Sequence, residues 1–279
     1  MKRVAIMSDS SADISALDAK RLNIHIVRMP IIVDGKEYKE EIDIDAQTII
    51  DKMRTGSIVK TAQPVLGDMF NMWDELLLEY DEVFYLPLAR ALSGTCAIAI
   101  ETAKNYDGRV IVVDSNYVSC PMIVMLEMVA DMLSKGYTSL ECKSMLENDS
   151  YLLAILIPEN LTTLKNGGRI SPAAASLAGL LKIVPLLKVD HGAIDIVTKV
   201  RTLSKAYKTG IEYITKDIDP ADYIWMIIDA DNPSASAILK EQLESVVKQP
   251  VLVRNFRAVI TSHTGPGTIG FGRIKKIKY

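Results

Sequence analysis

Ser93 and Gly94 are the residues whose place in the sequence best suits them to bind an anion. They follow the apolar segment 83–88, which we expect to be a strand, and they precede a run with helical spacing. We expect Ser93 to be the N-cap of that helix, because a helix N-terminus attracts anions through free N–H groups and a partial positive charge. The hydroxyl adds a donor, and Gly94 lacks the Cβ that would obstruct a ligand. A purely structural cap is the alternative.

Thr61 supplies a second hydroxyl. It lies in the segment 60–64, Lys-Thr-Ala-Gln-Pro, which we expect to be a break between two helices. No sheet ladder would use the backbone N–H groups of such a break. Two hydroxyls and a helix terminus directed at one point would suit a single carboxylate or phosphate. An ordinary loop threonine is the alternative, and the sequence alone does not show that Thr61 and Ser93 converge.

His263 stands in the most unusual stretch of the chain, the segment 262–268, Ser-His-Thr-Gly-Pro-Gly-Thr. We expect no regular element there, because the glycines and the proline favour close backbone approach and positive φ. The imidazole would then donate to an anionic group or act as a general base. A turn that merely satisfies the histidine explains the residue equally well.

Two further segments have compositions that suggest their place in the fold. The segment 171–181 is apolar all round, with Pro172 in its first turn, so we expect a helix that is buried on every side. Its small residues serve core packing or leave space for an apolar ligand. The segment 272–279 holds Arg273 and three lysines, which predicts an edge strand guarded by cations, with a basic docking patch as the alternative.

The order of strand-like and helix-like segments predicts two α/β domains. In the first half, apolar strands alternate with amphipathic helices, which indicates a mainly parallel sheet flanked by helices. In the second half, 183–189 and 193–200 read as an antiparallel hairpin, and two more strands alternate with helices, which indicates a mixed sheet. We expect the domains to be 1–155 and 156–279. The loops at the carboxyl ends of parallel strands are then the default ligand site.

Composition excludes several classes of protein. The 279 residues carry a net charge of −3, which lacks the basic surplus of nucleic-acid-binding proteins. No apolar run approaches the ~20 residues that cross a bilayer, and the apolar run within the first residues is too short for a secretory signal. Three scattered cysteines indicate reduced thiols and hence a cytoplasmic protein. With three histidines, none close to another in sequence, we expect no metal centre.

Six motifs in order give the whole chain a resemblance to one family. They read SDSSAD, KTAQP, LSGT, NGGRIS, KVRTLSKA and HTGPGTIG. With these motifs the chain resembles the bacterial DegV proteins and is similar to the carrier subunits of bacterial fatty acid kinase. The resemblance implies a two-domain α/β protein that buries a fatty acid tail, with the carboxylate held near the domain junction.

The resemblance also implies a set of binding residues. The threonine of the second motif is Thr61 and the serine of the third is Ser93, and in this family these two hydroxyls bind the carboxylate. Ala62 and Gly94 accompany them, and the histidine of the last motif, His263, lies close to the head group. Two arginines, Arg169 and Arg201, are implied contacts of the head group or of a kinase partner.

The chain departs from the family pattern at two places. Ala62 stands where the motif usually has a serine, which removes one hydroxyl. Cys96 and Ala97 occupy a region where an aromatic residue commonly follows. Neither change removes Thr61 or Ser93, but both leave open the lining of the pocket and the preferred length of the acyl chain.

The combined interpretation is a carrier without catalytic residues, cofactor or metal. It binds a long-chain fatty acid and presents it to the catalytic subunit of a fatty acid kinase, and it allows transient membrane contact. No Walker-type phosphate loop is present, which argues against an intrinsic kinase. One alternative is a lipid hydrolase or acyltransferase that uses Ser93 and His263, although the G-x-S-x-G pattern and an orienting acid are missing. Another is a sensor of lipid occupancy.

Overall fold

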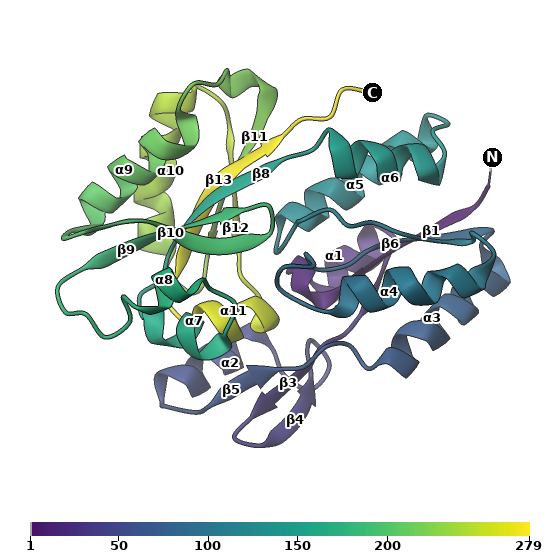
Figure 1. The fold of residues 1–279 in the computed structure, drawn as a ribbon, viewed down its shortest axis with the longest axis horizontal. Helices are drawn as coiled ribbons and strands as arrows, with labels where there is room; N and C mark the ends of the chain where they lie inside the picture. Colours follow the sequence, from purple (N-terminus) through teal and green to yellow (C-terminus); the bar gives the residue numbers. More distant parts are fainter. Residues whose placement is uncertain (1) are drawn as a thin grey trace. The chain divides into compact units, whose positions relative to one another are not determined.

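A computed structural model describes residues 2–279 and divides the chain into two compact units. Unit 1 comprises the residues up to Asp45, Ile58–Ser150 and Ile277–Tyr279. Unit 2 comprises Ala46–Ser57 and Tyr151–Lys276. Each unit therefore contains a segment that lies far from the rest of that unit in sequence (Figure 1).

Unit 1 is built on a parallel sheet, as the sequence predicts. Its four strands lie in the order β2-β1-β6-β7, and every neighbouring pair is parallel. The strands are β1 (Val4–Asp9), β2 (Ile24–Val27), β6 (Glu82–Leu86) and β7 (Val110–Val112). Helices α3 and α4 cover one face and α5 and α6 the other, with α1 beside β2 (Figure 1). The helices are α1 (Ala16–Arg21), α3 (Leu66–Glu79), α4 (Thr95–Ala103), α5 (Pro121–Ser134) and α6 (Ser139–Asn148).

A second, three-stranded sheet in unit 1 holds the segment that contains Thr61. Its strands, β3 (Pro30–Val33), β4 (Lys36–Lys39) and β5 (Val59–Thr61), lie in the antiparallel order β4-β3-β5. The expectation that the backbone at Thr61 lies outside any ladder is therefore wrong, because Thr61 pairs with Ile31. A strand of three residues is too short to show an alternating pattern in the sequence.

Unit 2 is built on a mixed six-stranded sheet, again as predicted. The order is β10-β9-β8-β13-β11-β12, and only β11 and β12 are parallel neighbours. The strands are β8 (Leu152–Ile157), β9 (Val184–Asp190), β10 (Ala193–Val200), β11 (Tyr223–Asp229), β12 (Val251–Asn255) and β13 (Ile269–Lys275). The helices are α2 (Ala46–Arg54), α7 (Leu161–Gly167), α8 (Pro172–Ala175), α9 (Leu203–Thr215), α10 (Pro233–Val247) and α11 (Ala258–Thr264). The hairpin of β9 and β10 confirms the predicted turn, with His191 and Gly192 both at positive φ.

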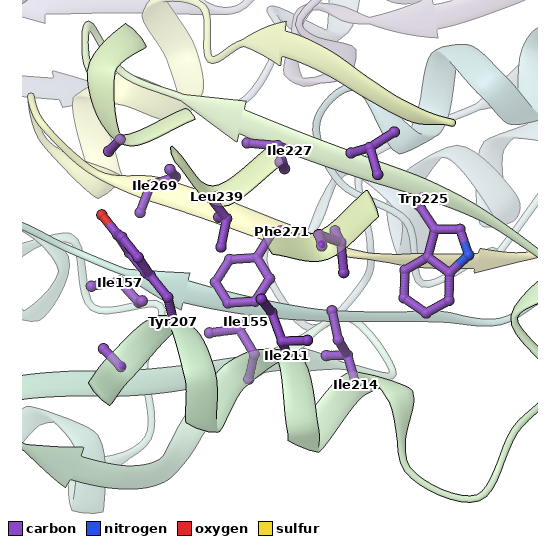
Figure 2. Packing of buried hydrophobic residues seen from close by; sticks show 14 of the residues in the cluster. Ile155, Ile157, Tyr207, Ile211, Ile214, Trp225, Ile227, Leu239, Ile269 and Phe271 are labelled. Carbon is purple, nitrogen blue, oxygen red and sulfur yellow. The ribbon is translucent and has the colours of Figure 1, made fainter. Parts of the chain in front are cut away.

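The core of unit 2 lies between the sheet and helices α9 and α10. Phe271 of β13 is at its centre and faces Ile211 of α9 (Figure 2). A Cβ on Gly210 would lie only 2.5 Å from Cζ of Phe271. The glycine thus lets α9 approach the sheet closely enough to bury this aromatic ring.

The prediction of an exposed edge strand at the C-terminus is wrong. Strand β13 lies in the interior of the sheet, between β8 and β11. Its arginine, Arg273, is only 8% exposed, donates from Nη1 to the carbonyl of Ile214 at 2.7 Å, and stacks over the ring of Tyr223. A cation at the last turn of α9 is favoured by the helix dipole, so the charge fits a buried position.

The predicted helix over 171–181 is also wrong in length and in burial. Helix α8 ends at Ala175, and Leu181 is 86% exposed. Gly179 and Lys182 adopt positive φ, which no helix continues through. Ala174 is buried, but Leu180 and Leu181 are exposed, so the apolar composition at the end of this segment does not reflect a core position.

Candidate functional site

Thr61 closes strand β5 at the edge of the three-stranded sheet. It is partly buried, and the N–H of the next residue, Ala62, donates to the carbonyl of Pro30 at 3.0 Å. Beyond this bond the chain leaves the sheet: Ala62 and Gln63 are exposed, and Pro64 is buried. The sheet thus fixes the backbone at Thr61, and the two residues after it project from the strand end.

Ser93 lies just before α4, and the N-cap of this helix is the next residue, Gly94, and not Ser93 as predicted. Gly94 has ordinary helical dihedrals, φ −70° and ψ −10°. The hydroxyl of Ser93 accepts a hydrogen bond from the N–H of Thr95 at 3.2 Å and lies 2.9 Å from the hydroxyl of Thr95. Two hydroxyls therefore meet at this helix end, where negative charge is favoured.

The loop that carries Ser93 is anchored at its start by a buried carboxylate. Asp9 at the end of β1 accepts hydrogen bonds from the N–H groups of Leu88 and Ser11, each at 2.9 Å. Burial raises the pKa of Asp9, and the hydrogen bonds from Ser11 and Leu88 oppose that rise. In the sequence Asp9 stands out only as part of the motif SDSSAD, and nothing in that motif indicates that it anchors this loop.

Two further contacts fix the same loop. The N–H of Ala89 donates to the carbonyl of Tyr117 at 3.0 Å, and Nε of Arg90 lies 3.0 Å from Oδ2 of Asp114. Asp114 follows the end of β7, so both anchors come from the carboxyl edge of the parallel sheet. That edge is where ligand sites are expected in such sheets.

The structure brings the segment after Thr61 against the segment of Ser93. A Cβ built on Gly94 would lie 2.7 Å from Nε2 of Gln63 and 3.7 Å from its Cδ. The side chain of Gln63 therefore rests on the backbone of Gly94. The two candidate hydroxyls, which are 32 positions apart in the sequence, thus stand on neighbouring segments of unit 1.

In unit 2, His263 lies in the last turn of helix α11, which corrects the expectation of an irregular segment. The helix ends at Gly265, and both Gly265 and Gly267 have positive φ. A Cβ on Gly265 would lie 3.2 Å from the hydroxyl of Thr163, and one on Gly267 would collide with the carboxylate of Glu159. The glycines therefore serve close packing against the start of α7.

Gly167 and Arg169 lie close to His263. A Cβ on Gly167 would lie 2.9 Å from Nδ1 of His263, and Nη1 of Arg169 donates to the carbonyl of Gly167. Burial, and secondarily the charge of Arg169, lower the pKa of His263 to about 4. At neutral pH the imidazole is therefore uncharged, and it is a weak general base.

Stability should depend on pH through His263. An unfolded histidine titrates near 6.5, whereas native His263 titrates near 4, so between these values the unfolded state binds more protons. The free energy of unfolding is therefore highest above pH 6.5 and decreases as the pH falls towards 4. We expect a decrease of about 2 kcal/mol, a value that allows for the partial exposure of His263. Urea unfolding at pH 7 and pH 4.5 measures this. In His263→Gln the loss should be smaller by that amount, and equal losses in the two proteins would contradict it.

Arg201 does not lie beside Arg169. Ile170 forms a bridge with Ile194 near the start of β10, whereas Arg201 follows the other end of that strand. At about 3.3 Å per residue the two positions are roughly 20 Å apart along β10. Arg201 is exposed in the turn that leads into α9. The two arginines are therefore well separated within unit 2.

Within residues 2–279, no cluster of three or more His, Cys, Asp or Glu side chains is arranged to hold a metal ion. The three cysteines, Cys96, Cys120 and Cys142, are buried and form no disulfide. None of the helices described in that range has the length and hydropathy to cross a bilayer.

Comparison with known proteins gives consistent similarities. The model of the DegV family, described as a family of uncharacterised proteins, matches residues 3–276. A DegV domain-containing protein of Streptococcus pneumoniae is 31% identical over 286 residues, which cover 99% of this chain and 100% of that protein. A DegV domain-containing protein of Staphylococcus aureus is 27% identical with the same coverage.

Two solved structures extend the similarity to the fold. A DegV family protein from Thermus thermophilus, described by its fatty acid binding, is 28% identical with a TM-score of 0.85, covering 98% of this chain and 99% of that one. A protein from Thermotoga maritima, described as revealing a fatty acid binding function, is 28% identical with a TM-score of 0.82 and covers 99% of both chains. The similarity thus extends over both units.

Proposed function

This chain belongs to the DegV family, and we propose that it binds a long-chain fatty acid whose carboxylate is held by the hydroxyls of Thr61 and Ser93. The observation that carries the proposal is the contact between Gln63 and Gly94, which sets the two hydroxyl-bearing segments side by side. The fatty acid binding described for the Thermus and Thermotoga relatives supports the ligand class. Ala62 and Gly94, on the same two segments of unit 1, complete the proposed site, with no metal or other cofactor.

Burial of the acyl chain should supply most of the affinity. A sixteen-carbon acid buries about 15 methylene and methyl groups at ~0.8 kcal/mol each, or about 12 kcal/mol before the costs of ordering. Hydroxyls and a helix N-terminus then orient the carboxylate without a full counter-ion. Binding by uncharged donors of this kind leaves a carboxylate oxygen available to a second protein.

The protein would therefore act as a carrier in the bacterial cytoplasm and not as an enzyme. It collects the acid through transient contact with the membrane and presents it to a fatty acid kinase, which supplies the catalytic groups for acyl-phosphate formation. Hydrolysis by Ser93 and His263 fits the site less well, because a histidine with a pKa of about 4 is a weak base at neutral pH.

Native mass spectrometry of the protein purified from cells tests the ligand. The expected result is a bound mass of about 250–300 Da, the range of long-chain acids. Titration of delipidated protein with palmitate should then restore the complex. Protein that carries no acid and takes up none would overturn the proposed function. Turnover of an acyl ester that disappears in Ser93→Ala would favour a hydrolase instead.

Replacing Arg201 tests the presentation to a kinase. Because Arg201 is exposed and about 20 Å along β10 from the Arg169 segment, Arg201→Ala should lower acyl-phosphate formation about tenfold and leave palmitate affinity unchanged. Phosphate transfer with the partner kinase and palmitate titration are the two measurements. Lys208→Ala on α9, another exposed cation, is the matched control. Equal losses in both assays would contradict a docking role.

A further inference from the structure

Gln63 occupies a position that nothing in the proposed site yet explains. It is the second residue after β5, and although the residue is exposed, its amide lies against the backbone of Gly94. Pro64, the next residue, is buried and restricts the conformation of Gln63 to extended values. The chain therefore presents the amide of Gln63 to the N-terminus of α4 from a fixed strand end.

The glycine at position 94 is explained by this amide and not by the backbone. Gly94 has φ −70° and ψ −10°, a conformation that any residue adopts. Serine, threonine, aspartate or asparagine would serve as an N-cap at least as well. A Cβ at this position, however, would lie 2.7 Å from Nε2 of Gln63, closer than van der Waals contact allows. Only glycine leaves the amide in place.

The chemistry of the amide fits an anionic ligand. Nε2 of a glutamine carries two N–H donors and no charge. Here it stands at the positive end of α4, next to the residue that carries the Ser93 hydroxyl. It follows the Thr61 hydroxyl by two residues. An acid group at this point would thus meet donors from both segments, all of them uncharged.

We propose that Gln63 is a specificity-determining residue of the head-group site, with an amide that rests on Gly94 and donates to the carboxylate of the bound acid. The assignment rests on the proposed function, because it presumes that Thr61 and Ser93 hold a carboxylate. It adds a third uncharged donor to the two hydroxyls. Selection of a free acid over an ester or an alcohol then depends on Gln63 together with the two hydroxyls.

An isosteric substitution tests the donor role. Gln63→Glu keeps the shape of the side chain but places a negative charge beside the ligand's carboxylate. Palmitate binding should weaken at least tenfold, whereas methyl palmitate, which carries no charge, should bind as before. A loss of folding or of pocket shape would lower both affinities alike. Unchanged palmitate affinity, or equal loss of both ligands, would overturn the assignment.

A double-variant cycle tests the link to Gly94. Gly94→Ala should displace the amide without unfolding the protein, since the obstructing atom is the end of a flexible side chain. Palmitate affinity should fall about as far as in Gln63→Ala, and the combined variant should lose no more than Gln63→Ala alone. If the affinity losses of the two single variants instead multiply in the combined variant, Gly94 makes room for the ligand itself, and the assignment would fall.

Two controls separate the possible failures. Gly67→Ala is the matched glycine variant, because a Cβ there meets no atom within 4 Å, and it should bind palmitate like the unsubstituted protein. If the unsubstituted protein binds neither palmitate nor its ester, the proposed function fails and Gln63 loses its role with it. If it binds palmitate and Gln63→Glu does so equally well, only the role of Gln63 fails.

Discussion

Replacing Thr61 and Ser93 together with alanine should weaken palmitate binding about 100-fold. A hydrogen bond from a hydroxyl to a charged carboxylate contributes about 1.5 kcal/mol or more, so two lost bonds amount to about 3 kcal/mol. The acyl chain would still be buried, so binding should weaken and not disappear. Titration of the delipidated double variant with palmitate measures the loss, and the single variants should each account for about half of it on a logarithmic scale.

The stability of the empty protein provides the control for this loss. Thr61 and Ser93 are both only partly buried, and the bond from Thr95 to the Ser93 hydroxyl sits at a helix end that water reaches. Its removal should cost no more than about 1 kcal/mol, so the midpoint of thermal unfolding should barely move. Methyl palmitate should bind the double variant nearly as well as the unsubstituted protein. Unaltered palmitate affinity would show that the head group lies elsewhere.

In unit 1 the sequence locates the backbone around Ser93 but not the strand that contains Thr61. The apolar run before Ser93 and the helical spacing after it locate the strand-to-helix transition to within one residue. Strand β5 escapes prediction because its pairing with β3 depends on residues about 30 positions away. The contact between Gln63 and Gly94 is equally non-local. Its only signal in the sequence is a glycine where a better N-cap residue would fit.

In unit 2 one error comes from sheet order, which local patterns do not encode. The charges of 272–279 suggest an edge strand, yet β13 enters between β8 and β11, and its residues up to Ile274 are buried. Arg273 is accommodated there by the carbonyl of Ile214, a partner known only once α9 has packed. The leucines of 171–181 mislead in the opposite sense. Their apolar character suggests burial, but Leu180 and Leu181, which follow the turn at Gly179, are exposed.

The interior position of β13 also leads to the largest effect on stability. Gly272 pairs with Ala154 of β8, and a Cβ at Gly272 would lie 2.6 Å from Cα of Ala154 and still closer to the carbonyl oxygen of Leu153. These are backbone atoms of the neighbouring strand, which cannot move without breaking ladder hydrogen bonds. Gly272→Ala should therefore destabilise the protein by about 3–5 kcal/mol, beyond ordinary overpacking.

Gly270 is the matched control for this substitution, since it lies two residues earlier in β13 and on the same face of the sheet. A Cβ there would lie 3.3 Å from Cζ of Phe256 and 3.5 Å from Cδ1 of Leu156, which are side-chain atoms able to shift. Gly270→Ala should cost about 1 kcal/mol. Urea unfolding of both variants, compared at an unchanged m-value, measures the difference. Equal midpoints would mean that β8 and β13 do not approach as closely at Gly272 as the structure shows, and the central position of β13 would then need revision.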